Sequence, residues 1–155
     1  MNRASATFLQ VVIAVVAIGS LALMLGEPHM EGRNAHATLF EIYFKDPFLA
    51  FAYVASIPVF VAFYQALKVT GYAGRNEIFS PAAVKAVRAI KYCAIAVIGF
   101  AAASEIYIVL INTSDDRAGG VFIGALITVA SGAIAAAAGM FERILQNAVD
   151  PKCRD

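Results

Sequence analysis

Four long apolar stretches, separated by short polar segments, occupy most of this 155-residue chain. Each is close to the ~20 residues that a helix needs to cross ~30 Å of hydrocarbon. Hydrophobic residues make up 61% of the chain and charged residues 15%, which is too apolar for a soluble domain of this length. The sequence therefore predicts one all-α transmembrane domain, an integral membrane four-helix bundle. The expected spans are residues 8–25, 48–68, 90–111 and 119–141.

Positive charge is distributed unevenly among the polar segments. Nine of the 12 Lys and Arg residues lie before the first span, in the segment from Lys68 to Lys91 that joins the second and third spans, or after the fourth. The two remaining segments hold three cations and most of the acidic residues. Because cytoplasmic loops of membrane proteins are enriched in Lys and Arg, we expect both termini in the cytoplasm. The spans are expected to contact the lipid bilayer.

The third helix is predicted to begin well before its membrane span. Ser80 is a good N-cap and Pro81 suits the first helical turn. Phe79 and Val84 have the spacing of a hydrophobic staple. A helix from Pro81 to Leu110 is about 45 Å long, so we expect its first turns to extend into the cytoplasm.

Three basic residues share one side of that extension and form a basic collar, defined as Lys85, Arg88 and Lys91. One interpretation is that the collar lies against anionic lipid headgroups, where each cation contributes about 1 kcal/mol. The other is that it forms, with Phe79 and Ser80, a docking site for an acidic cytoplasmic partner. The two interpretations are compatible.

Glu105 is the most unusual residue of the third span, because it lies in an otherwise apolar run with Ser104 and Tyr107 as its polar neighbours. A carboxylate inside the membrane is costly and is often functional. One interpretation is a structural pair with Tyr107, Thr128 or Arg117. The alternative is that Glu105 handles protons or cations.

Small residues recur every fourth position along the fourth span, which predicts close packing against another helix. The row consists of Gly120, Gly124, Thr128, Gly132 and Ala136. Its spacing leaves two partners open: the second span of the same molecule, or a second copy of the chain in a homodimer.

Other polar or breaking residues give weaker signals. Pro58 predicts a kink in the second span, either an ordinary packing kink or a hinge beside a cavity. His29 and His36 are metal-competent but lack the spacing of a metal site. The sequence contains no phosphate-binding glycine loop, no paired nucleophile and base, and no paired metal motif. We therefore expect no enzymatic activity and no cofactor.

The segment Asn76–Cys93, which reads NEIFSPAAVKAVRAIKYC, resembles the signature of a bacterial membrane family. The resemblance continues through Glu105, the pair Asp115 and Asp116, and the stretch Phe141–Asp150, so it covers nearly the whole chain. The family is domain-of-unknown-function family 2975, which comprises small four-span proteins without an established activity. Its members commonly continue with a longer acidic tail, whereas this sequence ends at Asp155.

The resemblance implies a location in the bacterial inner membrane and a cytoplasmic partner. Genes of this family often neighbour a gene for a small helix-turn-helix DNA-binding protein. We therefore expect a regulatory or sensor protein that tethers such a regulator and does not itself bind nucleic acid. The alternatives are a small dimeric proton or cation transporter or channel that uses Glu105, and an accessory subunit of a membrane complex.

Overall fold

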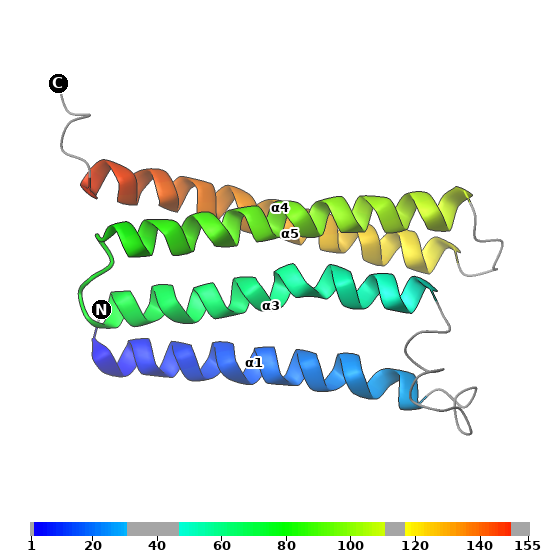
Figure 1. Cartoon of the computed structure of the whole chain (residues 1–155), viewed down its shortest axis with the longest axis horizontal. Helices are drawn as coiled ribbons and strands as arrows, with labels where there is room; N and C mark the ends of the chain where they lie inside the picture. Colours follow the sequence, from blue (N-terminus) through cyan, green and yellow to red (C-terminus); the bar gives the residue numbers. More distant parts are fainter. Residues whose placement is uncertain (1, 31–46, 111–116, 150–155) are drawn as a thin grey trace.

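The structure, a computed structural model, describes residues 2–30, 47–110 and 117–149. Within these ranges the chain consists of long helices that alternate in direction, with no strand (Figure 1). The helices are α1 (Arg3–Met30), α3 (Pro47–Gly74), α4 (Pro81–Leu110) and α5 (Arg117–Val149). Each is long and apolar enough to cross a membrane, which confirms the predicted all-helical protein with four spans.

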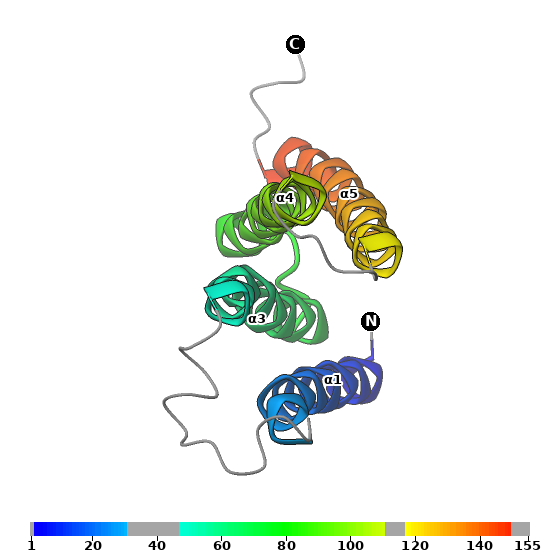
Figure 2. The ribbon, with the colours of Figure 1, turned by 90° about the vertical axis from the view of Figure 1, so that its right-hand side faces the viewer.

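The helices form an open row instead of a closed bundle. Helix α5 packs against α4, α4 against α3, and α3 against α1. The end-on view shows α1 and α5 at the two extremes of a curved arrangement (Figure 2). In lipid this is stable because α1 can leave apolar side chains outside the protein, as with Phe8 and Val15, which are 71% and 64% exposed. The four helices are therefore present as predicted, but they form an open row and not a closed bundle.

Every helix extends beyond its expected span, and the extensions of α3, α4 and α5 lie at the end of the molecule where α1 begins (Figure 1). Helix α3 continues to Gly74, α4 begins at Pro81, and α5 continues to Val149. A cluster of buried apolar side chains lies in these extensions, and Val69, Tyr72, Ile78, Ala138 and Val149 pack against it. The cluster comprises Ala83, Val84, Val87 and Leu145.

A compact turn joins α3 to α4 within the extensions. Asn76 adopts a left-handed backbone with φ of 59°. The Glu77 amide donates to the Tyr72 carbonyl at 2.8 Å, and the Asn76 amide to the Ala73 carbonyl at 3.3 Å. These two bonds form a Schellman motif, which satisfies the last carbonyls of α3.

The same turn starts α4 as predicted. The Ser80 hydroxyl accepts a hydrogen bond from the Ala83 amide at 3.2 Å, and Pro81 is the first helical residue. The predicted hydrophobic staple between Phe79 and Val84 does not form as expected. Phe79 is 63% exposed, and Ile78 instead packs against the buried cluster that contains Val84. The turn therefore holds Ile78 inward and leaves Phe79 outward.

Helix α1 is held against α3 by close approach and by two polar contacts. A Cβ on Gly74 would lie 2.6 Å from the Ala6 Cβ, so Gly74 allows the helices to meet. Gln10 Nε2 donates to the Leu67 carbonyl at 3.2 Å, and the Tyr53 hydroxyl donates to the Met24 carbonyl at 3.0 Å. Such bonds contribute about 0.6–2 kcal/mol each within a membrane.

Candidate functional site

The contact between α4 and α5 is the most extensive in the molecule and brings several of the predicted residues together. Four described residues of α5 are buried, and three of them, Gly124, Ser131 and Leu145, are multiples of seven residues apart; the fourth is Glu142. A repeat of seven keeps one face towards a neighbour that crosses at about 20°. Helix α5 therefore pairs with α4 in the manner of a coiled coil.

Glu105 lies at this contact. A Cβ on Gly124 would lie 2.6 Å from Glu105 Oε1 and 2.8 Å from its Cγ, so the glutamate side chain occupies the space that Gly124 leaves free. Glu105 Oε1 and Thr128 Oγ1 are both buried, and neither has a hydrogen-bond partner among the described residues. Of the neighbours named from the sequence, Ser104 donates to the Ala101 carbonyl at 2.8 Å, and Tyr107 is 38% exposed.

The row of small residues is divided between two environments. Gly120 faces Ile108, whose Cδ1 would lie 3.1 Å from an added Cβ, and Gly124 faces Glu105. Gly132 has no such neighbour within 4 Å, and Ala136 is exposed. The reason is geometric: a step of four residues turns a helix by about 400°, so the row drifts by about 160° over four steps.

The partner of Gly120 and Gly124 is α4, which neither of the two alternatives from the sequence had included. Helix α5 packs mainly against the third span, and its contact with the second span is at most slight. In an antiparallel pair joined by a short connection, the residues that meet are nearly equidistant from that connection. Glu105 and Gly124 satisfy this relation around residues 111–116, as do Arg88 and Glu142. Distance from the connection was therefore the signal that could have identified these pairs.

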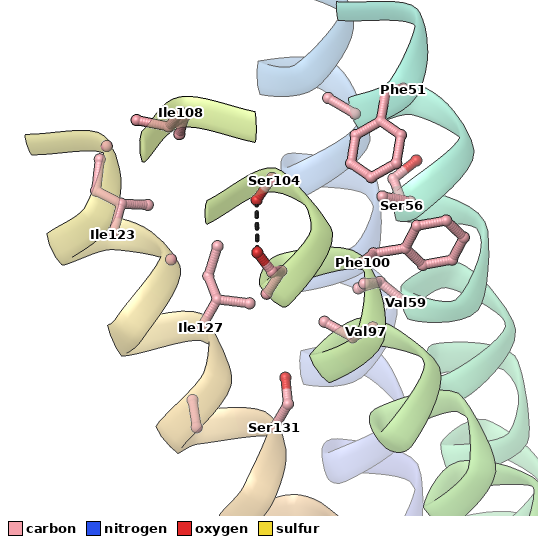
Figure 3. Close-up of a pocket in the computed structure, with 16 residues that line it drawn as sticks. Phe51, Ser56, Val59, Val97, Phe100, Ser104, Ile108, Ile123, Ile127 and Ser131 are labelled. Carbon is pink, nitrogen blue, oxygen red and sulfur yellow. Dashed lines mark hydrogen bonds between the residues drawn. The ribbon is translucent and has the colours of Figure 1, made fainter. Parts of the chain in front are cut away.

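An apolar cavity of about 560 Å³ lies between α3, α4 and α5 (Figure 3). Phe51 and Phe100 meet edge to face on its α3 side, with ring centroids 5.6 Å apart. The hydroxyls of Ser56 and Ser104 donate to carbonyls of their own helices. Pro58 lies within the unbroken helix α3 and is not among the lining residues, although Ser56 and Val59 on either side of it are.

The basic collar is joined to α5 by a buried carboxylate. Glu142 is 5% exposed, and its Oε1 and Oε2 accept hydrogen bonds of 2.6 Å from Arg88 Nε and Lys91 Nζ respectively. The side chains of Arg88 and Lys91 are 44% and 25% exposed. Two of the three collar cations are thus paired within the molecule, and the third, Lys85, is exposed. Glu142 was not predicted from the sequence as their partner.

Two lysine side chains lie over tyrosine rings at the same end of the molecule. Lys68 Nζ is 4.6 Å from the centre of the Tyr64 ring, and Lys91 Nζ is 4.9 Å from that of Tyr92. Tyr64 and Tyr92 are 57% and 60% exposed. Tyrosine and basic side chains of this kind are enriched at the boundary between hydrocarbon and headgroups.

Several residues named from the sequence lie outside the described part of the structure. They include His36, Asp115 and Asp116. The side chains of His29 and Arg117 are also outside it.

Comparisons with known proteins agree with the membrane architecture. A family model described as "Protein of unknown function (DUF2975)" matches residues 34–152. The chain belongs to this family. The uncharacterized membrane protein YoaS of Bacillus subtilis (strain 168) is 35% identical over 153 residues, which cover 98% of this chain and 96% of that protein. No solved structure matches.

The structure explains what the segment Asn76–Cys93 contributes to this DUF2975 protein. Asn76 ends α3, Ile78 enters the buried cluster, and Ser80 caps α4. Arg88 then links α4 to Glu142 on α5. The remaining conspicuous side chain is Phe79, which these contacts leave exposed.

Proposed function

We propose that this protein is a regulatory interaction protein of the bacterial inner membrane, which acts without catalysis and tethers a cytoplasmic DNA-binding regulator. The observation that carries the proposal is the exposure of Phe79 in a capped turn and of Lys85 on the helix that follows it. An aromatic ring and a cation that are both exposed are suited to an acidic protein surface with an apolar centre. The surface formed by Phe79 and Lys85 is called the docking surface below.

The docking surface belongs to the end that we propose extends into the cytoplasm. The buried cluster of Ala83, Val84, Val87 and Leu145 supports this orientation, because burial of apolar side chains is driven by water and has no comparable driving force in lipid. The excess of Lys and Arg at this end supports the cytoplasmic side. Reporter fusions at Arg75 and Arg33 should then report inside and outside respectively, and the opposite pattern would overturn the orientation.

Site-specific photocrosslinking in native membranes tests the tether. A crosslinker replaces Phe79 or Lys85, and the captured proteins are identified and assayed for binding to DNA. We expect a helix-turn-helix protein from both positions. The variants Phe79→Ala and Lys85→Glu should each abolish its co-purification with the chain, whereas Lys68→Glu should not, since Lys68 is an exposed cation on α3 stacked over Tyr64. Recovery of the chain alone from every sample would refute the tether.

A specific observation favours a second function, that of a small dimeric proton or cation transporter. Glu105 Oε1 is buried at the α4–α5 contact without a hydrogen-bond partner in the described residues, and Thr128 Oγ1 is in the same condition. Unpartnered oxygens in a membrane are suited to a proton or a cation. Reconstituted proteoliposomes should then show a flux that Glu105→Gln abolishes with folding retained. Equal flux in the two proteins would exclude Glu105 from transport.

A further inference from the structure

A second recess lies beside the basic collar, between the start of α4 and the end of α5. Its volume is about 450 Å³, and α4 contributes Lys85 and Arg88 to its lining. Helix α5 contributes Gln146 and Asn147. We call this recess the basic pocket. It is separate from the apolar cavity of Figure 3, which lies between α3, α4 and α5 further along the helices.

The polar groups of the basic pocket are mainly hydrogen-bond donors. Lys85 brings an ammonium group, and the two amides bring four N–H bonds. Arg88 uses Nε for Glu142, which leaves the N–H groups of its two Nη atoms for a ligand. No carboxylate is among the described lining residues, because Glu142 lies between Arg88 and Lys91 on the other side.

The charge of this region is positive after the internal pairing is taken into account. Glu142 balances one of its two partners, Arg88 and Lys91, and Lys85 adds a further positive charge. An arginine that presents two Nη groups matches the geometry of a phosphate, and a neighbouring lysine strengthens the attraction. The pocket is therefore suited to a phosphate anion.

The position of the pocket along α4 indicates the source of the phosphate. Tyr92, whose ring lies under Lys91, marks the expected level of the boundary between hydrocarbon and headgroups. Arg88 and Lys85 precede it on α4, about 6 Å and 10 Å further from the hydrocarbon at 1.5 Å per residue. Lipid phosphates lie in this layer.

We propose that the basic pocket binds the phosphate group of an anionic phospholipid. Arg88 and Lys85 contact the phosphate oxygens, and Asn147 donates a further hydrogen bond. Anionic lipids are preferred to zwitterionic ones, because the pocket offers no carboxylate, among its described lining residues, to the amine of a zwitterionic headgroup. This inference does not rest on the tether, since it requires no cytoplasmic partner.

Lipid binding to the purified full-length chain in detergent tests the proposal. The probes are dioleoylphosphatidylglycerol and dioleoylphosphatidylcholine, followed by native mass spectrometry. We expect Lys85→Gln to weaken binding of the anionic lipid about fivefold, the usual contribution of one interfacial cation. The matched control Lys68→Gln removes an exposed cation outside the pocket and should leave affinity within about twofold. Equal losses of affinity in the two variants would show that only the general surface charge matters, and would overturn the proposal.

A second pair of variants keeps every cation and adds one negative charge. Asn147→Asp places it in the pocket, whereas Ala148→Asp places it at an exposed position outside the lining. Only Asn147→Asp should reduce binding of the anionic lipid by at least about fivefold. Equal effects of the two substitutions, or equal binding of the two lipids by the native chain, would overturn the proposal.

Two further measurements distinguish the lipid site from a site for free anions and from the docking surface. Inorganic phosphate and glycerol 3-phosphate should not displace the lipid at concentrations equal to the lipid; displacement would identify a site for free anions and overturn the lipid source. Phe79→Ala should leave lipid binding unchanged, because Phe79 is outside the pocket lining. Loss of the cytoplasmic partner in Phe79→Ala with unchanged lipid binding would therefore concern the tether alone.

Discussion

The contact of Glu105 with Gly124 predicts that an added methyl group will have opposite effects at two glycines of α5. In a helix, Gly→Ala is usually stabilising by about 0.5–1 kcal/mol, because alanine loses less conformational freedom. At Gly132 no described atom outside the helix would lie within 4 Å of the methyl group, so this gain should be observed. At Gly124 the methyl group would lie 2.6 Å from Glu105 Oε1 and 2.8 Å from Cγ, so the glutamate or the helix must move.

Overpacking of this kind typically costs about 1–3 kcal/mol. After the propensity gain, Gly124→Ala should be destabilising by up to about 2 kcal/mol, and Gly132→Ala stabilising by up to about 1 kcal/mol. For a chain of this size, 1 kcal/mol changes the melting temperature by about 2–4 °C. The two variants should therefore melt several degrees apart, on opposite sides of the native protein.

The chain supplies a thiol for the assay. Cys93 is a free, half-buried cysteine on α4, so a thiol-reactive fluorophore reports its exposure on heating in detergent. Cys153 is first replaced by serine to leave one thiol. The Glu105→Ala background provides the control, since it removes the obstructing side chain and should make Gly124→Ala as favourable as Gly132→Ala. Equal melting of the two single variants, or a cost of Gly124→Ala that persists in the Glu105→Ala background, would show that the glutamate does not limit the space at Gly124.

Three further predictions use the same thermal assay. Ser80→Ala removes the cap of α4 and should lower the free energy of unfolding by about 1 kcal/mol, whereas Ser80→Asp retains a capping oxygen and should not. Equal effects of the two substitutions would show that the cap does not stabilise the protein. Glu142→Gln should lower the melting temperature by several degrees because it weakens two ion pairs at one buried carboxylate, whereas Glu77→Gln, in an exposed pair, should change it little. Gly74→Ala should lower the melting temperature by several degrees, since its methyl group would lie 2.6 Å from the Ala6 Cβ, and Ala6→Gly should restore it. The absence of rescue would place the strain elsewhere.

The helices could be predicted from the sequence because length and hydropathy determine which segments can cross hydrocarbon. The arrangement of the helices could not be predicted, because a residue that faces lipid and a residue that faces another helix can both be apolar. Phe8 and Val87 are both hydrophobic residues of predicted helices, yet Phe8 is 71% exposed and Val87 is 2% exposed. The open row of helices was therefore missed, whereas the start of α4 was found because Ser80 and Pro81 have specific local chemistry.

In the candidate site, too, individual residues could be predicted from the sequence but their packing partners could not. Glu105 was conspicuous as a carboxylate in an apolar run, but the glycine that accommodates it was identified only as a member of a row with an undecided partner. Glu142 was missed because it follows the expected fourth span and resembles an ordinary surface charge there. Its role depends on Arg88 and Lys91, which are distant in the sequence and become neighbours only when α4 and α5 are paired about their connection.

Under the proposed regulatory function, these contacts indicate which part of the molecule would move in response to a signal. Glu142 is bonded to two cations three residues apart on α4, so a slide of α5 by one turn, about 5.4 Å, would carry it away from at least one of them. Glu105 against Gly124 resists the same slide further along. The boundary between α3 and the α4–α5 pair instead contains the apolar cavity of about 560 Å³. We therefore expect a signal to move α3 relative to α4–α5. Because the Asn76–Pro81 turn joins these two parts, the movement would reach the docking surface at Phe79.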